Sequence, residues 1–323
     1  MSSEALINVG LLFVATSLLW KGAEWTVVSA CRVARRFNIS DSLIGTTVIA
    51  FGTSAPEVVV TLIAALNGQP DISVGNVVGS NIFNLGFILG GCALFTAIPT
   101  TRSLVLRDTT ALLCAATLLV FLLGDNLISR PQGALMMLLL AGYILFLTMR
   151  GEEASSEEDE FSLGPARARD FCLLAVGLAS VIGGAHLLVS SASSVALRMG
   201  LSEWAVGVTI VAGGTSLPEL ATSIAAARRG RTSLIAGTLI GSDLFNLLGV
   251  LGLAAVLHPL AVDPIATPSV VMMTIMVAMV LVFMRTGWTL TRLEGLALVG
   301  LAIVRWSRDL APQVWGLAPG LWY

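Results

Sequence analysis

Charged side chains are scarce in this sequence. Only 12% of the 323 residues are Asp, Glu, Lys or Arg, 56% are hydrophobic, and the mean hydropathy is +0.89. A soluble domain of this length carries about twice that share of charge, so the composition excludes a soluble globular protein and indicates a membrane protein. A single lysine and a net charge of −2 leave no polybasic stripe, and we expect no nucleic-acid partner.

Catalytic and soft-metal signatures are equally scarce. The two histidines do not stand at ligand spacing, no cysteine pair forms a CxxC motif, and neither HExxH nor GxSxG occurs. These absences exclude the common zinc-site and hydrolase patterns, so we expect neither an enzyme nor a cofactor, and no obligatory protein partner is evident. The cysteines lie in or beside apolar segments and are interpreted as free thiols: Cys31, Cys92, Cys114 and Cys172.

Long apolar runs occupy most of the chain. Because about 20 apolar residues cross a bilayer, the pattern predicts an all-α membrane protein with ten transmembrane helices. The first and sixth are longer than a bilayer requires, which favours a tilted path. The ten predicted spans are residues 5–34, 42–67, 72–98, 106–124, 131–149, 170–198, 203–228, 232–258, 267–285 and 291–310.

The two halves of the chain are similar to each other. The segment GTTVIAFGTSAPEVVVTLIAALNG at 45–68 returns as GVTIVAGGTSLPELATSIAAARRG at 207–230, and the offset of 162 holds without a gap over about residues 22–99. A register of this length indicates internal duplication. Because each half has an odd number of predicted spans, the two copies must enter the membrane in opposite orientations, as inverted five-helix repeats with broken core helices.

Arginines are distributed unevenly between the predicted loops. With the N-terminus outside, thirteen of the seventeen arginines fall on the cytoplasmic side, in agreement with the positive-inside rule. Both termini are therefore predicted outside a multi-pass protein of the cell membrane. The predicted units are a first repeat at 1–150 with core motif 45–90, a cytoplasmic linker at 151–169, and a second repeat at 170–323 with core motif 207–252.

Each repeat carries one glutamate inside an apolar run. Glu57 follows Pro56 and Glu219 follows Pro218 at equivalent positions. Proline lacks an N–H and clashes with the carbonyl four residues earlier, so each helix is predicted to break there. A kinked helix with a satisfying hydroxyl would explain the prolines but not two retained carboxylates. Ionisable groups inside the membrane are costly and usually functional, and a pair on broken helices predicts the binding site of a transporter.

Oxygen-bearing side chains surround both glutamates in the sequence. In each half a serine and an asparagine at i and i+4 share one face of the next helix; helix packing is the alternative explanation for the serines. An all-oxygen set suits Ca²⁺ or Na⁺ rather than soft metals, and two carboxylates neutralise one Ca²⁺. These predicted ligands are Thr53, Ser54, Ser80, Asn84, Thr215, Ser216, Ser242 and Asn246.

The motifs GTSAPE (52–57), GSNIFN (79–84), GGTSLPE (213–219) and GSDLFN (241–246) resemble the two alpha-repeats of the cation/Ca²⁺ exchanger superfamily, in particular its prokaryotic sodium/calcium exchanger-like members. The resemblance implies an ion core of the second, third, seventh and eighth helices, across which the first and sixth slide. It also implies a central Ca²⁺ site from Glu57, Glu219 and the carbonyls of Thr53 and Thr215. Two flanking Na⁺ sites would use Ala50, Ser54 and Ser80, and Ala212, Ser216 and Ser242.

One departure from that pattern lies in the second repeat. Some sodium/calcium exchangers of the superfamily carry Asp at the position of Asn246, whereas this chain has Asn there and Asp243 where the first repeat has Asn81. Asp243 either supplies a third carboxylate to the site or faces a neighbouring helix. The departure bears on ion stoichiometry and on the choice between Na⁺ and H⁺ as the coupling ion.

Two charged groups outside the core also admit two explanations. Lys21 and Glu24 break the internal symmetry of the first helix; a local ion pair is favoured over a gating role. The six acidic residues within 152–160 favour a solvated linker over a cation-sensing loop.

The sequence as a whole predicts a secondary antiporter that exchanges Ca²⁺ for Na⁺ across a lipid bilayer. A Ca²⁺/H⁺ antiporter of the same fold is the main alternative. A third interpretation is an intramembrane enzyme, but this sequence contains no nucleophile–base pair. A fourth is a channel, and the inverted repeat with broken helices argues for alternating access instead.

Overall fold

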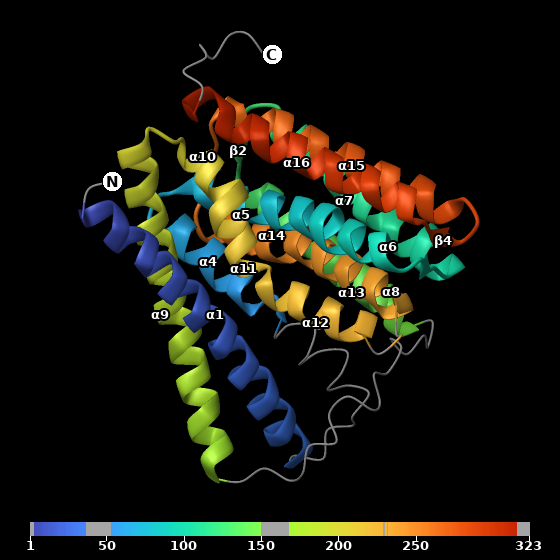
Figure 1. Cartoon of the computed structure of the whole chain (residues 1–323), viewed down its shortest axis with the longest axis horizontal. Helices are drawn as coiled ribbons and strands as arrows, with labels where there is room; N and C mark the ends of the chain where they lie inside the picture. The colour runs from blue at the N-terminus through green and yellow to red at the C-terminus, as the bar shows by residue number, and fades with distance from the viewer. Residues whose placement is uncertain (1–2, 37–52, 150–167, 229, 231, 315–323) are drawn as a thin grey trace.

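The computed structural model describes residues 3–36, 53–149, 168–228, 230 and 232–314. These residues form helices joined by short connections, with four strands of two residues each (Figure 1). Six of the described helical runs are long and apolar enough to cross a membrane, which confirms an all-α membrane protein. They are Pro70–Phe95, Leu104–Leu122, Arg130–Met149, Arg169–Ser194, Thr232–Leu257 and Pro264–Arg285.

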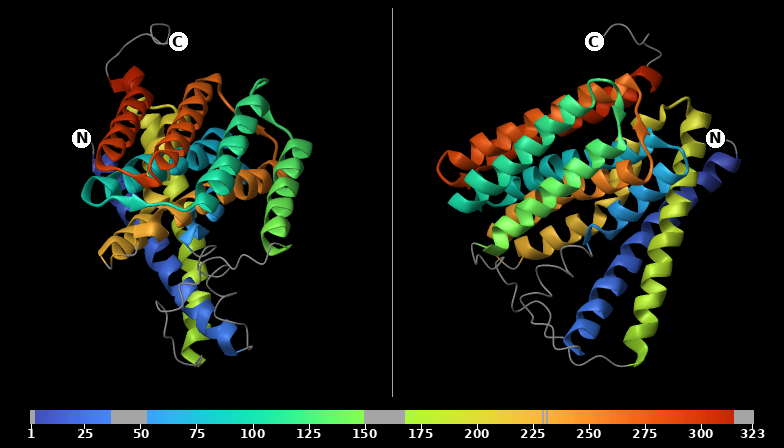
Figure 2. Two further views of the ribbon diagram at one scale, coloured as in Figure 1. Left: turned by 90° about the vertical axis from the view of Figure 1, so that its right-hand side faces the viewer. Right: turned by 180° about the vertical axis from the view of Figure 1, so that it is seen from behind.

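Two long helices form one side of the molecule. Helix α1 (Ser3–Arg36) has 34 residues and α9 (Ala168–Met199) has 32, so the predicted excess length of the first and sixth spans is confirmed. They run side by side, at a steep angle to the other helices (Figure 2). Their backbones approach closely at small residues: a Cβ on Gly22 would lie 2.9 Å from the carbonyl oxygen of Gly177.

The central helices are interrupted in both halves. The first half contributes α4 (Ala55–Leu66), α5 (Pro70–Phe83), the π-helix η2 (Asn84–Gly90) and α6 (Gly91–Phe95). The second half contributes α10 (Glu203–Val206), the π-helix η4 (Gly207–Val211), α11 (Ala212–Thr215), α12 (Leu217–Arg228), α13 (Thr232–Phe245), the π-helix η5 (Asn246–Val250) and α14 (Leu251–Leu257).

The remaining helices cover the core. They are the π-helix η3 (Leu104–Thr109), α7 (Thr110–Leu122), α8 (Arg130–Met149), the 3-10 helix η6 (Pro264–Ala266), α15 (Thr267–Arg285) and α16 (Arg292–Val314). In Figures 1 and 2 the central helices lie between α15 and α16 on one side and the α1–α9 pair on the other. The main cluster of buried apolar residues joins α5, α7, α13, α14 and α15.

The element boundaries recur at the sequence offset of 162 residues. Helices α4 and α12 begin and end at equivalent positions, as do α5 and α13. The π-helices η2 and η5 both begin at the equivalent asparagines, Asn84 and Asn246. Because π-helical turns are rare and often lie at functional sites, their recurrence draws attention to these two asparagines.

Four short strands join the two halves at the ends of the helices. Strand β1 (Ile98–Pro99) pairs with β4 (Thr289–Leu290), and β2 (Leu127–Ile128) pairs with β3 (Leu260–Ala261), both antiparallel. Each pair thus takes one strand from each half. The loops that carry the strands therefore hold the two halves together by backbone hydrogen bonds.

Four predicted spans are not among the six long apolar helices. They correspond to α1, α4, the broken run from α10 to α12, and α16. Length, interruption or charge separates three of them from the others: α4 is short, the α10–α12 run is broken, and α16 carries a buried ion pair between Arg305 and Asp309.

The predicted pair of charges on α1 is a local ion pair. Lys21 Nζ lies 2.7 Å from Glu24 Oε2, and both side chains are about half exposed, which confirms the favoured explanation. Linker residues 150–167 lie outside the described part.

Candidate ion-binding site

Both glutamates lie in the first turn of a helix that begins directly after a serine. Ser54, with φ −84° and ψ 5°, precedes α4, and Ser216, with φ −82° and ψ 8°, separates α11 from α12. Each serine lies two residues before a proline, whose missing N–H predicts a break there. Glu57 and Glu219 then occupy the first turn of the following helix, whose positive end stabilises a carboxylate. The predicted break is therefore confirmed at the second motif, where α11 and α12 lie on either side of Ser216; residues 37–52, which precede the first motif, lie outside the described part.

Each glutamate is held by the serine of the other half. Ser216 Oγ donates a hydrogen bond to Glu57 Oε1 at 3.1 Å, and Ser54 Oγ donates to Glu219 Oε1 at 3.2 Å. Both carboxylates are almost completely buried, with 0% and 1% of their surface exposed. The two motifs, 162 residues apart in the sequence, therefore form one site.

The other hydroxyls also meet across the two halves. Ser54 Oγ lies 2.9 Å from Ser242 Oγ, and Ser80 Oγ lies 3.4 Å from Thr215 Oγ1. Thr215 Oγ1 also contacts the Ala212 carbonyl oxygen at 3.1 Å. Both hydroxyl pairs join opposite repeats, so predicted ligands of the two halves lie close together.

One buried asparagine of the site was missed in the sequence. Asn76 Oδ1 accepts a hydrogen bond from Thr215 Oγ1 at 3.1 Å, and its Nδ2 donates to Thr61 Oγ1 at 2.9 Å and to the Glu57 carbonyl at 3.4 Å. The comparison of repeats does not reveal it, because Thr238 stands at the equivalent position. A buried amide in an apolar helix was the available signal.

The third buried carboxylate faces the helix run of the first half. Asp243 Oδ1 accepts a hydrogen bond from Asn84 Nδ2 at 2.8 Å, and the Asp243 carbonyl accepts one from Asn81 Nδ2 at 3.2 Å. All three side chains are fully buried. Asp243 therefore contacts a neighbouring helix run, the one that also carries Ser80.

Several buried polar atoms of this region have no hydrogen-bond partner. They are Glu57 Oε2, Glu219 Oε2, Asp243 Oδ2, Asn81 Oδ1, Asn84 Oδ1 and both amide atoms of Asn246. All but one are oxygens, the ligands that hard cations prefer. Buried polar groups are costly unless they are paired, and no described lysine or arginine forms an ion pair with these carboxylates. These unpartnered oxygens therefore fit the binding of cations, which would be transported rather than permanently held.

The remaining predicted ligands are placed as follows. Thr53 is buried at the break before α4, and Ala212 begins α11 and is fully buried. Ala50 lies outside the described residues. The structure thus brings together Glu57, Glu219, Ser54, Ser80, Thr215, Ser216, Ser242 and Ala212 in one hydrogen-bonded neighbourhood, with Asn84 joined to Asp243 beside it.

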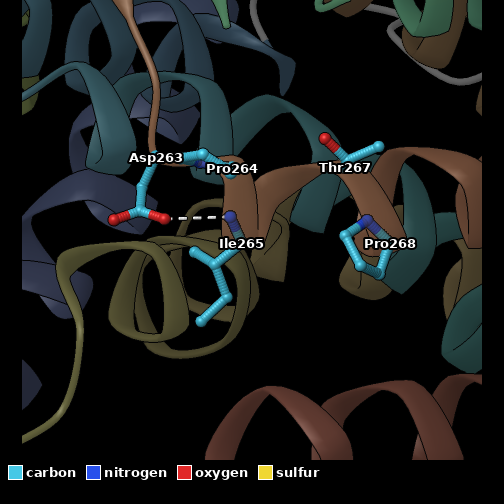
Figure 3. Close-up of a pocket in the computed structure, with 5 residues that line it drawn as sticks. All are labelled: Asp263, Pro264, Ile265, Thr267 and Pro268. Atoms are coloured by element: carbon cyan, nitrogen blue, oxygen red, sulfur yellow. Dashed lines mark hydrogen bonds between the residues drawn. The ribbon is translucent and has the colours of Figure 1, made fainter. Parts of the chain in front are cut away.

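A surface pocket of about 440 Å³ lies apart from these residues. It is lined by Asp263, Pro264, Ile265, Thr267 and Pro268 (Figure 3). Its only carboxylate already accepts a hydrogen bond from the Ile265 backbone at 2.9 Å, as the cap of η6. The pocket therefore lacks the converging unpartnered oxygens that mark the buried site.

Known proteins resemble this chain over nearly its whole length. Residues 7–149 and 170–305 match the family described as sodium/calcium exchanger protein. The sodium/calcium exchanger MaX1 of Methanosarcina acetivorans is 30% identical, over 91% of this chain and 95% of its own length. The inner membrane protein YrbG of Escherichia coli is 34% identical, over 82% of each chain. A solved structure of the sodium-calcium exchanger NCX_Mj, soaked with Na⁺ and Sr²⁺, superposes with a TM-score of 0.63 at 30% identity, covering 93% of this chain and 98% of that one.

Proposed function

Because the chain belongs to the sodium/calcium exchanger protein family, we propose that it is a secondary antiporter in which Ca²⁺ and Na⁺ take turns at one buried site. Exchange of Ca²⁺ for Na⁺ is the activity that the family, its relatives and the fold support. The observation that carries the proposal is the pair of buried glutamates, each held by the serine of the opposite half. Ions that compete for the same carboxylates cannot cross together, which couples their movements.

The central site is assigned to Glu57 and Glu219, each of which keeps an unpartnered Oε2. Two carboxylates match the charge of one Ca²⁺, and the carbonyls of Thr53 and Thr215 would complete a flexible oxygen shell. For Na⁺, one flanking site is assigned to Ala50, Ser54 and Ser80, and the other to Ala212, Ser216 and Ser242. The hydroxyl contacts of Ser54 with Ser242 and of Ser80 with Thr215 support placing these sites next to each other.

The membrane topology is assigned from the sequence. Ten helices form two inverted five-helix repeats, 1–150 and 170–323, around a cytoplasmic linker at 151–169, with both termini outside the cell membrane. The recurrence of element boundaries at the offset of 162 supports this arrangement. The α1–α9 pair contacts α4, α11 and α12 and would slide across them, opening the site to each side in turn.

The test is ⁴⁵Ca²⁺ uptake into proteoliposomes loaded with Na⁺, compared with choline-loaded vesicles and with an imposed pH gradient. Uptake that requires internal Na⁺ supports the proposal; uptake driven only by the pH gradient contradicts it. Glu57→Gln or Glu219→Gln should abolish uptake while the protein still inserts, because each removes half of the charge that neutralises Ca²⁺. Wild-type uptake in either variant would refute the site assignment.

A further inference from the structure

The two halves meet at residues 81 and 243, which are equivalent positions in the two repeats. Asn81 Nδ2 donates a hydrogen bond to the carbonyl oxygen of Asp243, its own counterpart at the offset of 162. Two equivalent residues can touch only where the halves meet at their approximate symmetry axis. The chain therefore places a carboxylate on one side of that axis and an amide on the other.

This asymmetry changes the hydrogen bonding around the axis. Asn84 Nδ2 donates to Asp243 Oδ1 at 2.8 Å, but the equivalent bond from Asn246 Nδ2 to Asn81 Oδ1 is not made, and both of those atoms are unpartnered. Residues three apart lie on the same helix face, so Asn81 with Asn84 and Asp243 with Asn246 present their side chains together. The cluster has three amide oxygens and one carboxylate oxygen without a donor.

The charge of the cluster identifies the class of its ligand. Glu57 and Glu219 already match one Ca²⁺, so Asp243 is a third buried negative charge, and none of the described basic side chains forms an ion pair with it. A buried carboxylate without a cation strongly destabilises the folded protein. One carboxylate and three amides carry a single negative charge and offer only hard oxygen ligands, which suits a monovalent cation better than Ca²⁺.

We propose that Asp243, Asn81, Asn84 and Asn246 form a separate Na⁺ subsite between the two halves, distinct from the sites that use Glu57 and Glu219. As a step in the exchange cycle it rests on the proposed function. Asp243 supplies the only negative charge of this subsite. It thereby adds one Na⁺ to the number exchanged for each Ca²⁺.

The first test measures the Na⁺:Ca²⁺ coupling ratio in proteoliposomes. The membrane potential is clamped, and the ratio is calculated from the Na⁺ and Ca²⁺ gradients at which net Ca²⁺ flux is zero. This ratio is an equilibrium quantity, so a slow variant still reports it. Asp243→Asn should lower the ratio by about one Na⁺. The double variant Asn81→Asp with Asp243→Asn moves the carboxylate across the axis and should restore the wild-type ratio. A wild-type ratio in Asp243→Asn overturns the proposal. This holds also if the variant loses a proton flux, because Asp243 would then bind H⁺ rather than Na⁺.

A second test does not require transport. Na⁺ is titrated against the melting temperature of the detergent-purified protein without Ca²⁺, with N-methylglucamine holding the ionic strength constant. Asp243→Asn should need at least about tenfold more Na⁺ for the same stabilisation, since a charged ligand is lost. An unchanged Na⁺ titration overturns the subsite. If wild-type protein fails to couple Na⁺ to Ca²⁺, the proposed function fails, while this titration still decides the subsite.

Discussion

At the residue scale, the two glutamates depend on each other's motif. Ser54 belongs to the first motif but bonds to Glu219, and Ser216 belongs to the second but bonds to Glu57. A hydrogen bond to a charged group contributes roughly 1.5–3 kcal/mol. Each serine therefore supports the carboxylate 159 or 165 residues away rather than the one three residues along its own chain.

The crosswise pairing can be tested with double-mutant cycles. Ser54→Ala combined with Glu219→Gln should show an interaction energy of at least about 0.5 kcal/mol, because the two side chains share a hydrogen bond. Ser54→Ala combined with Glu57→Gln is the matched control and should be closer to additive. Melting temperatures of the four purified proteins of each cycle give the comparison. Stronger coupling of Ser54 to Glu57 than to Glu219 would contradict the pairing.

At the element scale, the core requires close approach of two interrupted helices. Helix α5 packs against η4 and α11 at Gly79, where an added Cβ would overlap the Val208 carbonyl oxygen and lie 2.6 Å from the Ala212 Cβ. A chain of buried hydrogen bonds connects α10, which begins this broken run, to α15 and α16. Trp204 Nε1 donates to Ser269 Oγ, which in turn donates to Asp309 Oδ1. The backbone contact and these hydrogen bonds together hold the interrupted run in place.

Gly79→Ala should separate α5 from α11. Overpacking of a buried contact costs about 1–3 kcal/mol, and here the clash is with backbone rather than with a flexible side chain. We expect a lower melting temperature and a loss of Na⁺-dependent Ca²⁺ uptake. Gly142→Ala is the control, since that glycine lies exposed on α8 with nothing within 4 Å of an added Cβ. Equal effects of the two substitutions would refute the importance of this contact.

At the scale of the whole molecule, α1 and α9 pack more extensively against each other than against any other helix. Gly22, Gly177 and Gly184 bring the two backbones together, and Arg32 forms an ion pair with Asp170 at 2.7 Å. Contacts from α1 to the core are sparser, among them Thr16 against Gly214 of α11. Such a division fits a pair of helices that moves as one body.

Cross-linking distinguishes motion within the pair from motion against the core. In a background without native cysteines, Leu18→Cys with Gly184→Cys joins α1 to α9, and Thr16→Cys with Gly214→Cys joins α1 to α11; both pairs lie within reach of a disulfide. Oxidation should leave exchange in the first pair and stop it in the second, and reduction should restore it. Continued exchange in the oxidised second pair would rule out sliding of α1 over the core.

Several features of this protein follow from the sequence alone. The duplicated motif identifies Glu57 and Glu219 as equivalent, and Pro218 predicts the helix break at Ser216 because proline lacks an N–H. The excess length of α1 and α9 follows from their uninterrupted apolar runs. These features are local, since they depend on backbone chemistry and on the sequence within one helix.

Which oxygens lie next to each other depends on how the helices pack, and the sequence does not show this. Helical periodicity tells which residues occupy one face, but not which helix faces it. The hydroxyl contacts between Ser54 and Ser242 and between Ser80 and Thr215 therefore could not be predicted, nor could the contact of Asn76 with Thr215, since Asn76 has no counterpart in the second repeat. Asp243 meets Asn84 for the same reason: the symmetry axis brings together residues that the chain separates by 159 positions.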